Sequence, residues 1–108
     1  MDPKNVTFVI PALNEAEGIG PVVRGLLETF PTAELIVVDD GSTDDTAKIA
    51  TEAGARVITH DRNRGYGAGL KTGTRASTRD FVLFCDSDGQ HTVEDVGRVM
   101  MAHEDAGM

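Results

Sequence analysis

The chain has 108 residues, which leaves room for one small domain. Its 18 Asp and Glu outnumber its 10 Lys and Arg, and the net charge of −8 argues against nucleic-acid binding and against a polybasic membrane-binding surface. The sequence contains no signal peptide and no apolar run of membrane length, so we expect a cytoplasmic location, either free or at the cytoplasmic face of a membrane within a longer parent protein.

Short apolar runs alternate with helical patterns along the chain. Strands are expected at 6–10, 34–38, 55–59 and 80–85, with helices at about 20–30, at about 44–53, after a glycine-rich turn, and from about 93. Pro11 breaks the first strand, Pro21 suits a first helical turn, and Gly54 suits a helix C-terminus. The alternation implies right-handed crossovers and predicts a single α/β domain over 1–108, with a parallel sheet and helices on both faces.

Two of the expected strands end in acidic turns. Asp39 and Asp40 follow the 34–38 run, whereas Asp86 and Asp88 follow the 80–85 run. Because the carboxyl ends of parallel strands meet at one edge of the sheet, where ligands bind in open α/β folds, both turns are expected at one crevice. Paired carboxylates on a short turn suit a hard divalent cation that takes its other ligands from water and substrate phosphates. This pattern predicts a magnesium- or manganese-assisted phosphate-ester site.

Other polar residues near these turns have structural explanations or suit an anion. Ser42 or Thr43 can cap the next helix, and Asp44 and Asp45 then favour its N-terminal dipole, so neither acid needs a further function. A glycine-rich segment, 63–71, follows the third expected strand. Half of the basic residues cluster beside it: Arg62, Arg64, Lys71, Arg75 and Arg79. This cluster offers an anionic ligand a place to bind, with Arg75 and Arg79 interpreted as a solvated helix face.

Three stretches, 9–15, 38–44 and 86–91, together resemble the signature stretches of family 2 glycosyltransferases with the GT-A fold. The segment 63–73 resembles the loop that lies between the second and third of them. The order and spacing match across nearly the whole chain. Within this family the pattern is closest to the dolichol-phosphate mannose or glucose synthases, because Gln90 and His91 follow the acidic pair.

The resemblance implies a Rossmann-like GT-A domain that binds a uridine- or guanosine-diphosphate sugar with Mg²⁺ or Mn²⁺. It assigns nucleotide binding to Pro11, Ala12, Leu13, Glu15, Val38, Asp40 and Lys71. Asp40 would accept hydrogen bonds from the base, and Asp86 and Asp88 would hold the metal, with Gln90 as a further ligand. Relatives often place a tyrosine at the position of Leu13, where only an apolar side-chain contact is available here.

The resemblance also implies that the chain is the donor-binding part of a transferase, either a truncated product or one subunit of a split enzyme. Family 2 enzymes continue into a stretch that supplies more of the sheet, the acceptor site and usually a carboxylate base, so the general base is expected outside these residues. A polyprenyl phosphate acceptor would depend less on that base, because its nucleophile is already an anion. The implied strand order 3-2-1-4 leaves 80–85 at an open edge, which predicts self-association through that strand.

Three other functions are weighed against this one. A dinucleotide-binding oxidoreductase needs Gly-x-Gly-x-x-Gly directly after a strand, and Gly65, Gly67 and Gly69 lack that spacing. A receiver domain would end its third strand in an aspartate, whereas Thr59 and His60 stand here. A nucleotide-sugar-binding module without turnover stays open. No His–Cys cluster supports zinc.

Overall fold

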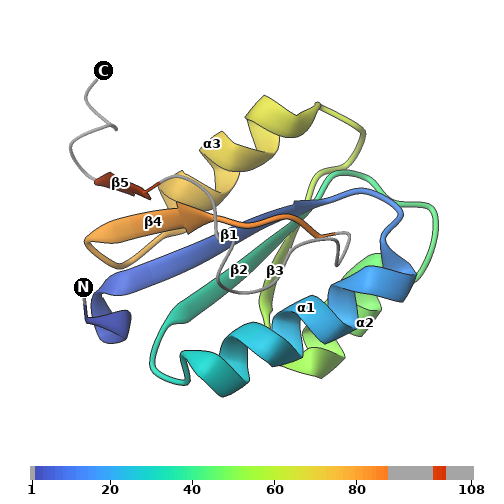
Figure 1. Ribbon diagram of the computed structural model, residues 1–108. Helices are drawn as coiled ribbons and strands as arrows, with labels where there is room; N and C mark the ends of the chain where they lie inside the picture. Colours follow the sequence, from blue (N-terminus) through green and yellow to red (C-terminus); the bar gives the residue numbers. More distant parts are fainter. Residues whose placement is uncertain (1, 88–98, 102–108) are drawn as a thin grey trace.

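The computed structural model describes residues 2–87 and 99–101 (Figure 1). Its elements, in chain order, are η1 (Pro3–Asn5), β1 (Val6–Ala12), α1 (Ala16–Thr29), β2 (Glu34–Asp39), α2 (Thr46–Ala53), β3 (Arg56–Thr59), α3 (Tyr66–Ala76), β4 (Phe81–Phe84) and β5 (Val99–Met101). The sheet order is β3-β2-β1-β4-β5, and the first four strands are mutually parallel. The predicted α/β class, the four parallel strands and their order 3-2-1-4 are confirmed.

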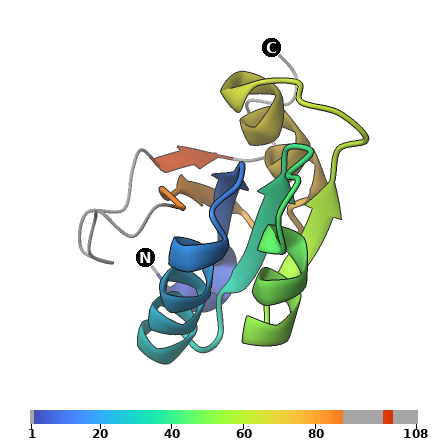
Figure 2. The same ribbon diagram turned by 90° about the vertical axis from the view of Figure 1, so that its right-hand side faces the viewer.

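The central strand β1 divides the core between the two faces of the sheet. Alternate residues of a strand point to opposite faces, and Phe8 and Ile10 belong to a different buried cluster from Val9. The Phe8 cluster includes Ile19 and Val23 of α1, so α1 and its neighbour α2 cover that face. The opposite face carries α3, which packs on β1 and β2 (Figure 2). Both faces are therefore covered, as a parallel sheet requires.

Close packing of α3 on β1 depends on small residues. A Cβ atom built on Gly73 would lie 2.2 Å from Cγ1 of Val9, and one built on Gly69 would lie 3.1 Å from Cβ of Pro11. These two glycines stand one helical turn apart and face the same strand. Their lack of side chains lets the helix approach the end of β1 where the acidic turns also converge.

Helix α1 begins earlier than the sequence predicts, at Ala16 rather than at about residue 20. Pro21 lies inside the helix on an exposed face, and its missing N–H removes one helical hydrogen bond. The helix start carries no side-chain cap of its own; instead the Ala16 N–H donates to Oδ2 of Asp44, 3.3 Å away on the next loop. A cap from a distant segment leaves no local signal in the sequence.

The first strand continues through Pro11 to Ala12, although the proline was predicted to break it. Val9 directs its carbonyl to β4, where it accepts a hydrogen bond from the Cys85 N–H at 3.0 Å. Pro11 stands two residues further along, so its nitrogen faces the same side, beyond the last β1–β4 pair, Val9 with Phe84. A missing donor costs no ladder hydrogen bond there, and the strand tolerates the proline.

The second helix is capped differently from the prediction. Its first residue is Thr46, whose N–H donates to Oδ1 of Asp44 at 3.0 Å, with the Thr46 hydroxyl also donating to that oxygen. Ser42 and Thr43 contact the β1–α1 loop instead. Asp44 thus serves the start of both helices, and these hydrogen bonds, the Thr46 hydroxyl first among them, lower the pKa of its carboxyl group. The structural role expected for Asp44 is confirmed, and Gly54 ends α2 with φ 113° as predicted.

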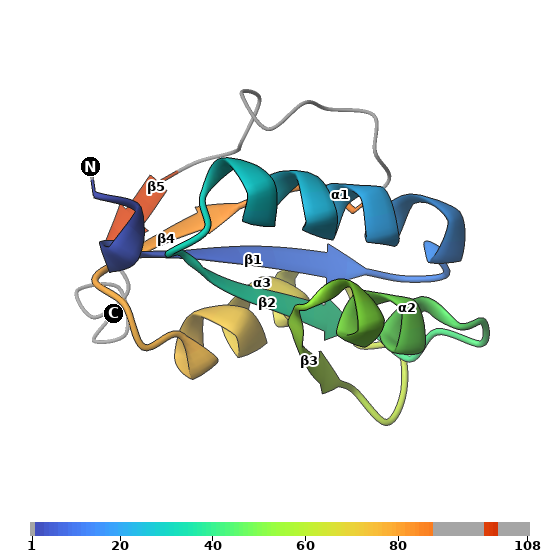
Figure 3. The ribbon, with the colours of Figure 1, turned by 90° about the horizontal axis from the view of Figure 1, so that it is seen from below.

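The outer edge of β4 is not open, so the open edge on which the prediction of self-association rested is absent. β5 pairs with β4 in antiparallel register, with Phe81 opposite Met101 and Leu83 opposite Val99 (Figure 3). The backbone groups that would have invited another chain are therefore paired within this one. The strand at 99–101 also replaces part of the helix predicted from about 93, whose residues 93–98 lie outside the described ones. None of the helices within the described residues is long and apolar enough to cross a membrane.

We predict that Gly73→Ala destabilises the domain by about 1–3 kcal/mol, because the new methyl group would overlap Val9 and force the helix away from the sheet. Gly67→Ala is the matched control on the same helix, since a Cβ there meets nothing within 4 Å. The control should be neutral or stabilising by about 0.4–1 kcal/mol. Urea denaturation of both variants measures the difference, and equal stability of the two would contradict the packing argument.

Candidate functional site

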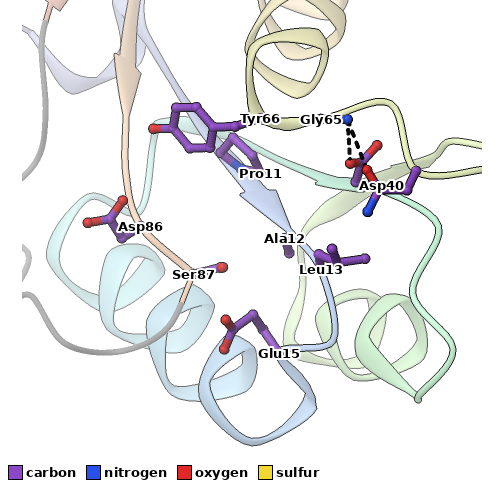
Figure 4. Close-up of a pocket in the computed structure, with 10 residues that line it drawn as sticks. Pro11, Ala12, Leu13, Glu15, Asp40, Gly65, Tyr66, Asp86 and Ser87 are labelled. Carbon is purple, nitrogen blue, oxygen red and sulfur yellow. Dashed lines mark hydrogen bonds between the residues drawn. The ribbon is translucent and has the colours of Figure 1, made fainter.

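A cavity of about 270 Å³ opens at the carboxyl edge of the parallel sheet. It is lined by Pro11, Ala12, Leu13, Glu15, Asp40, Asn63, Gly65, Tyr66, Asp86 and Ser87. Figure 4 shows Asp40 and Gly65 on one side of the end of β1, and Asp86 and Ser87 on the other. This arrangement follows from the strand order, because β2 and β4 flank β1 and end at the same edge. The two acidic turns singled out from the sequence therefore meet at one cavity.

The two flanking loops of the cavity are tied to each other. Asn14 adopts a left-handed conformation with φ 53°, and its Oδ1 accepts the Thr43 N–H at 2.8 Å. The Asn14 N–H donates to Oγ of Ser42 at 2.9 Å, and the Glu15 N–H donates to Oγ1 of the buried Thr46 at 2.9 Å. Asparagine tolerates this backbone region better than most residues do. These contacts fix the segment that presents Leu13 and Glu15 to the cavity.

Apolar surface is exposed at the cavity on two side chains. Among the described residues, Leu13 and Tyr66 are the large hydrophobic residues that remain exposed, at 40% and 61%. Both line the cavity, and they come from different elements, the β1–α1 loop and the first turn of α3. Exposed apolar groups gathered at a concave site with a few polar groups are typical of ligand binding.

Asp40 is buried beside the cavity, with 6% of its surface exposed. Its Oδ1 lies 2.7 Å from Nδ1 of His60 and accepts the Arg64 N–H at 2.9 Å, while its Oδ2 accepts the Gly65 N–H at 2.9 Å. Burial alone raises the pKa of Asp40, but these hydrogen bonds, that of His60 first, outweigh it and hold the pKa below its ordinary value. Asp40 is therefore an ionised carboxylate at the wall of the cavity.

The structure separates the residues that the sequence grouped as nucleotide-binding. Five of them line the cavity: Pro11, Ala12, Leu13, Glu15 and Asp40. Val38 does not, because it is fully buried in the core cluster beneath α3, and Lys71 lies exposed on α3 outside the lining. Of the predicted metal ligands, Asp86 is exposed at the cavity, whereas Asp88 and Gln90 lie outside the described residues.

Several lining residues were not assigned to the site from the sequence. Asn63, Gly65 and Tyr66 belong to the glycine-rich segment, which resembles a loop of the family but was given no residue-level role, and Ser87 stands between the paired aspartates. His60 was interpreted as the end of a strand, yet it contacts Asp40 directly. No sequence pattern marks such a contact, since the two residues are 20 positions apart and meet only when β2 and β3 pair.

The side chains at the Asp86 end of the cavity that can ligate a metal are carboxylates. Asp86 and Glu15 both line it, and hard cations such as Mg²⁺ are commonly held by one or two carboxylates together with water and phosphate oxygens. In the described part of the chain, no group of three or more His, Cys, Asp or Glu gathers into a closed metal site. The residues present thus fit a metal shared with a phosphate ligand better than a structural metal.

Comparisons with known proteins agree with this geometry. The family model described as "Glycosyl transferase family 2" matches residues 7–108. An uncharacterised protein of Methanocaldococcus jannaschii is 38% identical over 98 residues, which cover 88% of this chain and 40% of that protein. Glucosyl-3-phosphoglycerate synthase of Mycolicibacterium paratuberculosis is 39% identical over 99 residues, covering 79% of this chain and 29% of the enzyme.

Solved structures show the same similarity. The glucosyl-3-phosphoglycerate synthase of Mycobacterium tuberculosis, in complex with Mn²⁺, UDP-glucose and phosphoglyceric acid, superposes with a TM-score of 0.69 at 36% identity, covering 76% of this chain and 32% of that one. Mannosyl-3-phosphoglycerate synthase of Rubrobacter xylanophilus gives a TM-score of 0.73 at 27% identity, covering 82% and 32%. The chain thus spans less than half of the length of these relatives. Its fold is of the GT-A type, and the chain belongs to glycosyltransferase family 2.

Proposed function

We propose that this chain is the donor-binding part of a metal-dependent enzyme that transfers a hexose from a UDP-sugar to a phosphorylated acceptor. The observation that carries the proposal is the single cavity that joins a buried, ionised Asp40 on one side of β1 to an exposed Asp86 on the other. A base can be recognised at the first end and a diphosphate with its metal at the second. The similar glucosyl-3-phosphoglycerate synthase of M. tuberculosis was solved with UDP and with UDP-glucose, which favours uridine over guanosine.

The Asp40 end suits a nucleobase because it combines a charged acceptor with apolar surface. A ring N–H of the base can donate to the carboxylate, and such charge-assisted hydrogen bonds are stronger than neutral ones. Leu13 lies close by in the lining and offers an apolar contact to the ring. The β1–α1 loop that carries Leu13 is held by the Asn14 contacts. Binding a ligand therefore costs little conformational entropy in this loop.

The Asp86 end suits the diphosphate. We propose Asp86 as a metal ligand, with Asp88 and Gln90 completing the set; the bound ion would act as a Lewis acid that stabilises charge on the departing nucleoside diphosphate. Transfer breaks the bond between the anomeric carbon and the phosphate oxygen and forms one to an acceptor oxygen. The described residues bind and orient the donor for this step, and the acceptor site and any general base belong to the rest of the enzyme.

For the acceptor, a small phosphorylated acid is favoured, because similar enzymes are phosphoglycerate glycosyltransferases and one was solved with phosphoglyceric acid. A polyprenyl phosphate, inferred from the resemblance of Gln90 and His91, is the second candidate. The two differ in their apolar part and share a phosphate. Incubation of the full-length enzyme with radiolabelled UDP-glucose and either acceptor distinguishes them. Transfer to a polyprenyl phosphate moves the label into the organic phase, whereas transfer to phosphoglycerate gives an aqueous product that chromatography separates from UDP-glucose.

We predict that UDP binds this chain more tightly with Mn²⁺ than without it. The Asp86→Asn substitution should weaken UDP binding in the presence of Mn²⁺ by about tenfold, because the metal loses a charged ligand. Asp80→Asn is the control, since Asp80 precedes β4 at the opposite edge of the sheet from Asp86. Calorimetric titration with UDP, with and without Mn²⁺, measures both. Equal affinity of the unsubstituted chain in the two buffers would rule out the metal assignment.

We also predict that Asp40→Asn weakens UDP binding by one to two orders of magnitude, about 1.5–3 kcal/mol, while leaving the binding of pyrophosphate with Mn²⁺ nearly unchanged. The reason is that Asp40 contacts the base end, whereas pyrophosphate occupies only the Asp86 end. The same titrations with the two ligands test this. If the substitution weakened the binding of both ligands equally, or unfolded the chain, Asp40 would have a structural role and not a role in base recognition.

A further inference from the structure

His60 connects three elements behind the cavity. It follows β3, only 6% of its surface is exposed, and its N–H donates to the Asp39 carbonyl at 2.8 Å. One ring nitrogen, Nδ1, lies 2.7 Å from Oδ1 of Asp40, and the other, Nε2, lies 2.8 Å from Oγ1 of Thr72 on α3. The His60 ring therefore connects Asp40, at the end of β2, to helix α3.

The hydrogen-bond network assigns the proton on this ring. Asp40 is ionised and only accepts, so Nδ1 of His60 carries the proton toward it. Nε2 pairs with the Thr72 hydroxyl, which can either donate or accept. Both ring nitrogens therefore have a partner, and no buried side-chain atom within the described residues lacks one.

The same network leaves the Asp40 carboxylate with one acceptor position to spare. A carboxylate has about four lone-pair sites, and three are used: two on Oδ1, by His60 and the Arg64 N–H, and one on Oδ2, by the Gly65 N–H. Asp40 and its partner Gly65 both line the cavity, so an acceptor site on Oδ2 is available at the wall where a ligand would bind. The direction of that site depends on the side-chain rotamer of Asp40.

We propose that His60 is a positioning residue for nucleotide recognition. Its Nδ1–H holds the Asp40 carboxylate in the rotamer that presents the remaining Oδ2 site to the base. In the same rotamer the carboxylate accepts the N–H groups of Arg64 and Gly65 and so anchors that turn. Thr72 fixes the ring from behind, so α3 and the base pocket are coupled through one histidine. The ligand contacts Asp40, not His60, and this inference rests on the proposed binding of UDP at the cavity.

A pair of amide substitutions separates the two ring contacts. The side-chain amide of His60→Asn can place a donor near the position of Nδ1, whereas that of His60→Gln reaches toward Nε2 and leaves Asp40 without its donor. We expect His60→Asn to bind UDP with Mn²⁺ within about threefold of the unsubstituted chain and His60→Gln about tenfold more weakly. Pyrophosphate with Mn²⁺ should bind both variants equally. Amide hydrogen exchange at Gly65 should be faster in the Gln variant alone.

The outcomes separate this inference from the proposed function. If the unsubstituted chain does not bind UDP, the proposed function fails, and Gly65 exchange in the two variants still decides whether His60 positions the turn. If UDP binds but the Asn and Gln variants behave alike, the positioning role is wrong. Should neither variant fold, the Nδ1–H resonance of the unsubstituted chain replaces them: a shift on adding UDP is expected, and an unmoved signal would overturn the inference.

Discussion

A carboxylate buried at the end of β2 must find hydrogen-bond donors, because an unpaired charge away from water is very costly. Asp40 meets this requirement with the ring of His60 and with the backbone N–H groups of Arg64 and Gly65. Those donors come from the end of β3 and from the turn before α3. Satisfying one charge therefore fixes the path of the chain over the whole β3–α3 connection, and this connection forms one wall of the cavity.

The loop after β1, which presents Leu13 and Glu15 to the cavity, is fixed by a second set of contacts that does not involve the Asp40 carboxylate. Asp44 accepts hydrogen bonds from the starts of both α1 and α2, and Asn14 exchanges hydrogen bonds with Ser42 and Thr43. The loops after β1 and β2 thereby hold each other. Neither loop needs the ligand to acquire its shape, which limits the ordering cost of binding. Substitutions in this second set should act through the position of Leu13 and Glu15 rather than through the base contact.

The sequence predicts the parallel strands well because each is a short, continuous apolar run, and such runs are typical of strands buried on both faces. Acidic turns at the ends of β2 and β4 also follow from the sequence, since parallel strands bring their carboxyl ends to one edge. Gly54 was identified as a helix end because its left-handed conformation is one that glycine adopts readily. These features are local, and local chemistry is visible in a single sequence.

The features that were missed depend on contacts between distant segments. Pro21 suggested a helix start, but the true start at Ala16 is capped by Asp44, 28 positions away. The pairing of β5 with β4 involves Val99–Met101, and only three-dimensional proximity reveals it. Val38 stands two residues before Asp40 and points to the same face of the sheet, but it lies within β2 in the buried core, whereas Asp40 follows the end of the strand and reaches the cavity. His60 likewise gains its role only when β3 lies beside β2.

The two ends of the cavity differ in how much of their organisation comes from the described chain. At the Asp40 end, a buried carboxylate, its donors and the tied loops are already in place, as base recognition by hydrogen bonding requires. At the other end Asp86 is exposed, and the chemistry assigned to it needs less protein structure, because an ion such as Mg²⁺ takes much of its coordination from water and phosphate oxygens. A preformed base pocket can hold the donor while the metal and diphosphate complete each other's coordination. Under the proposed function, specificity for the nucleotide would come from the Asp40 end, and stabilisation of the charge that develops on bond cleavage would come from a metal held at the Asp86 end.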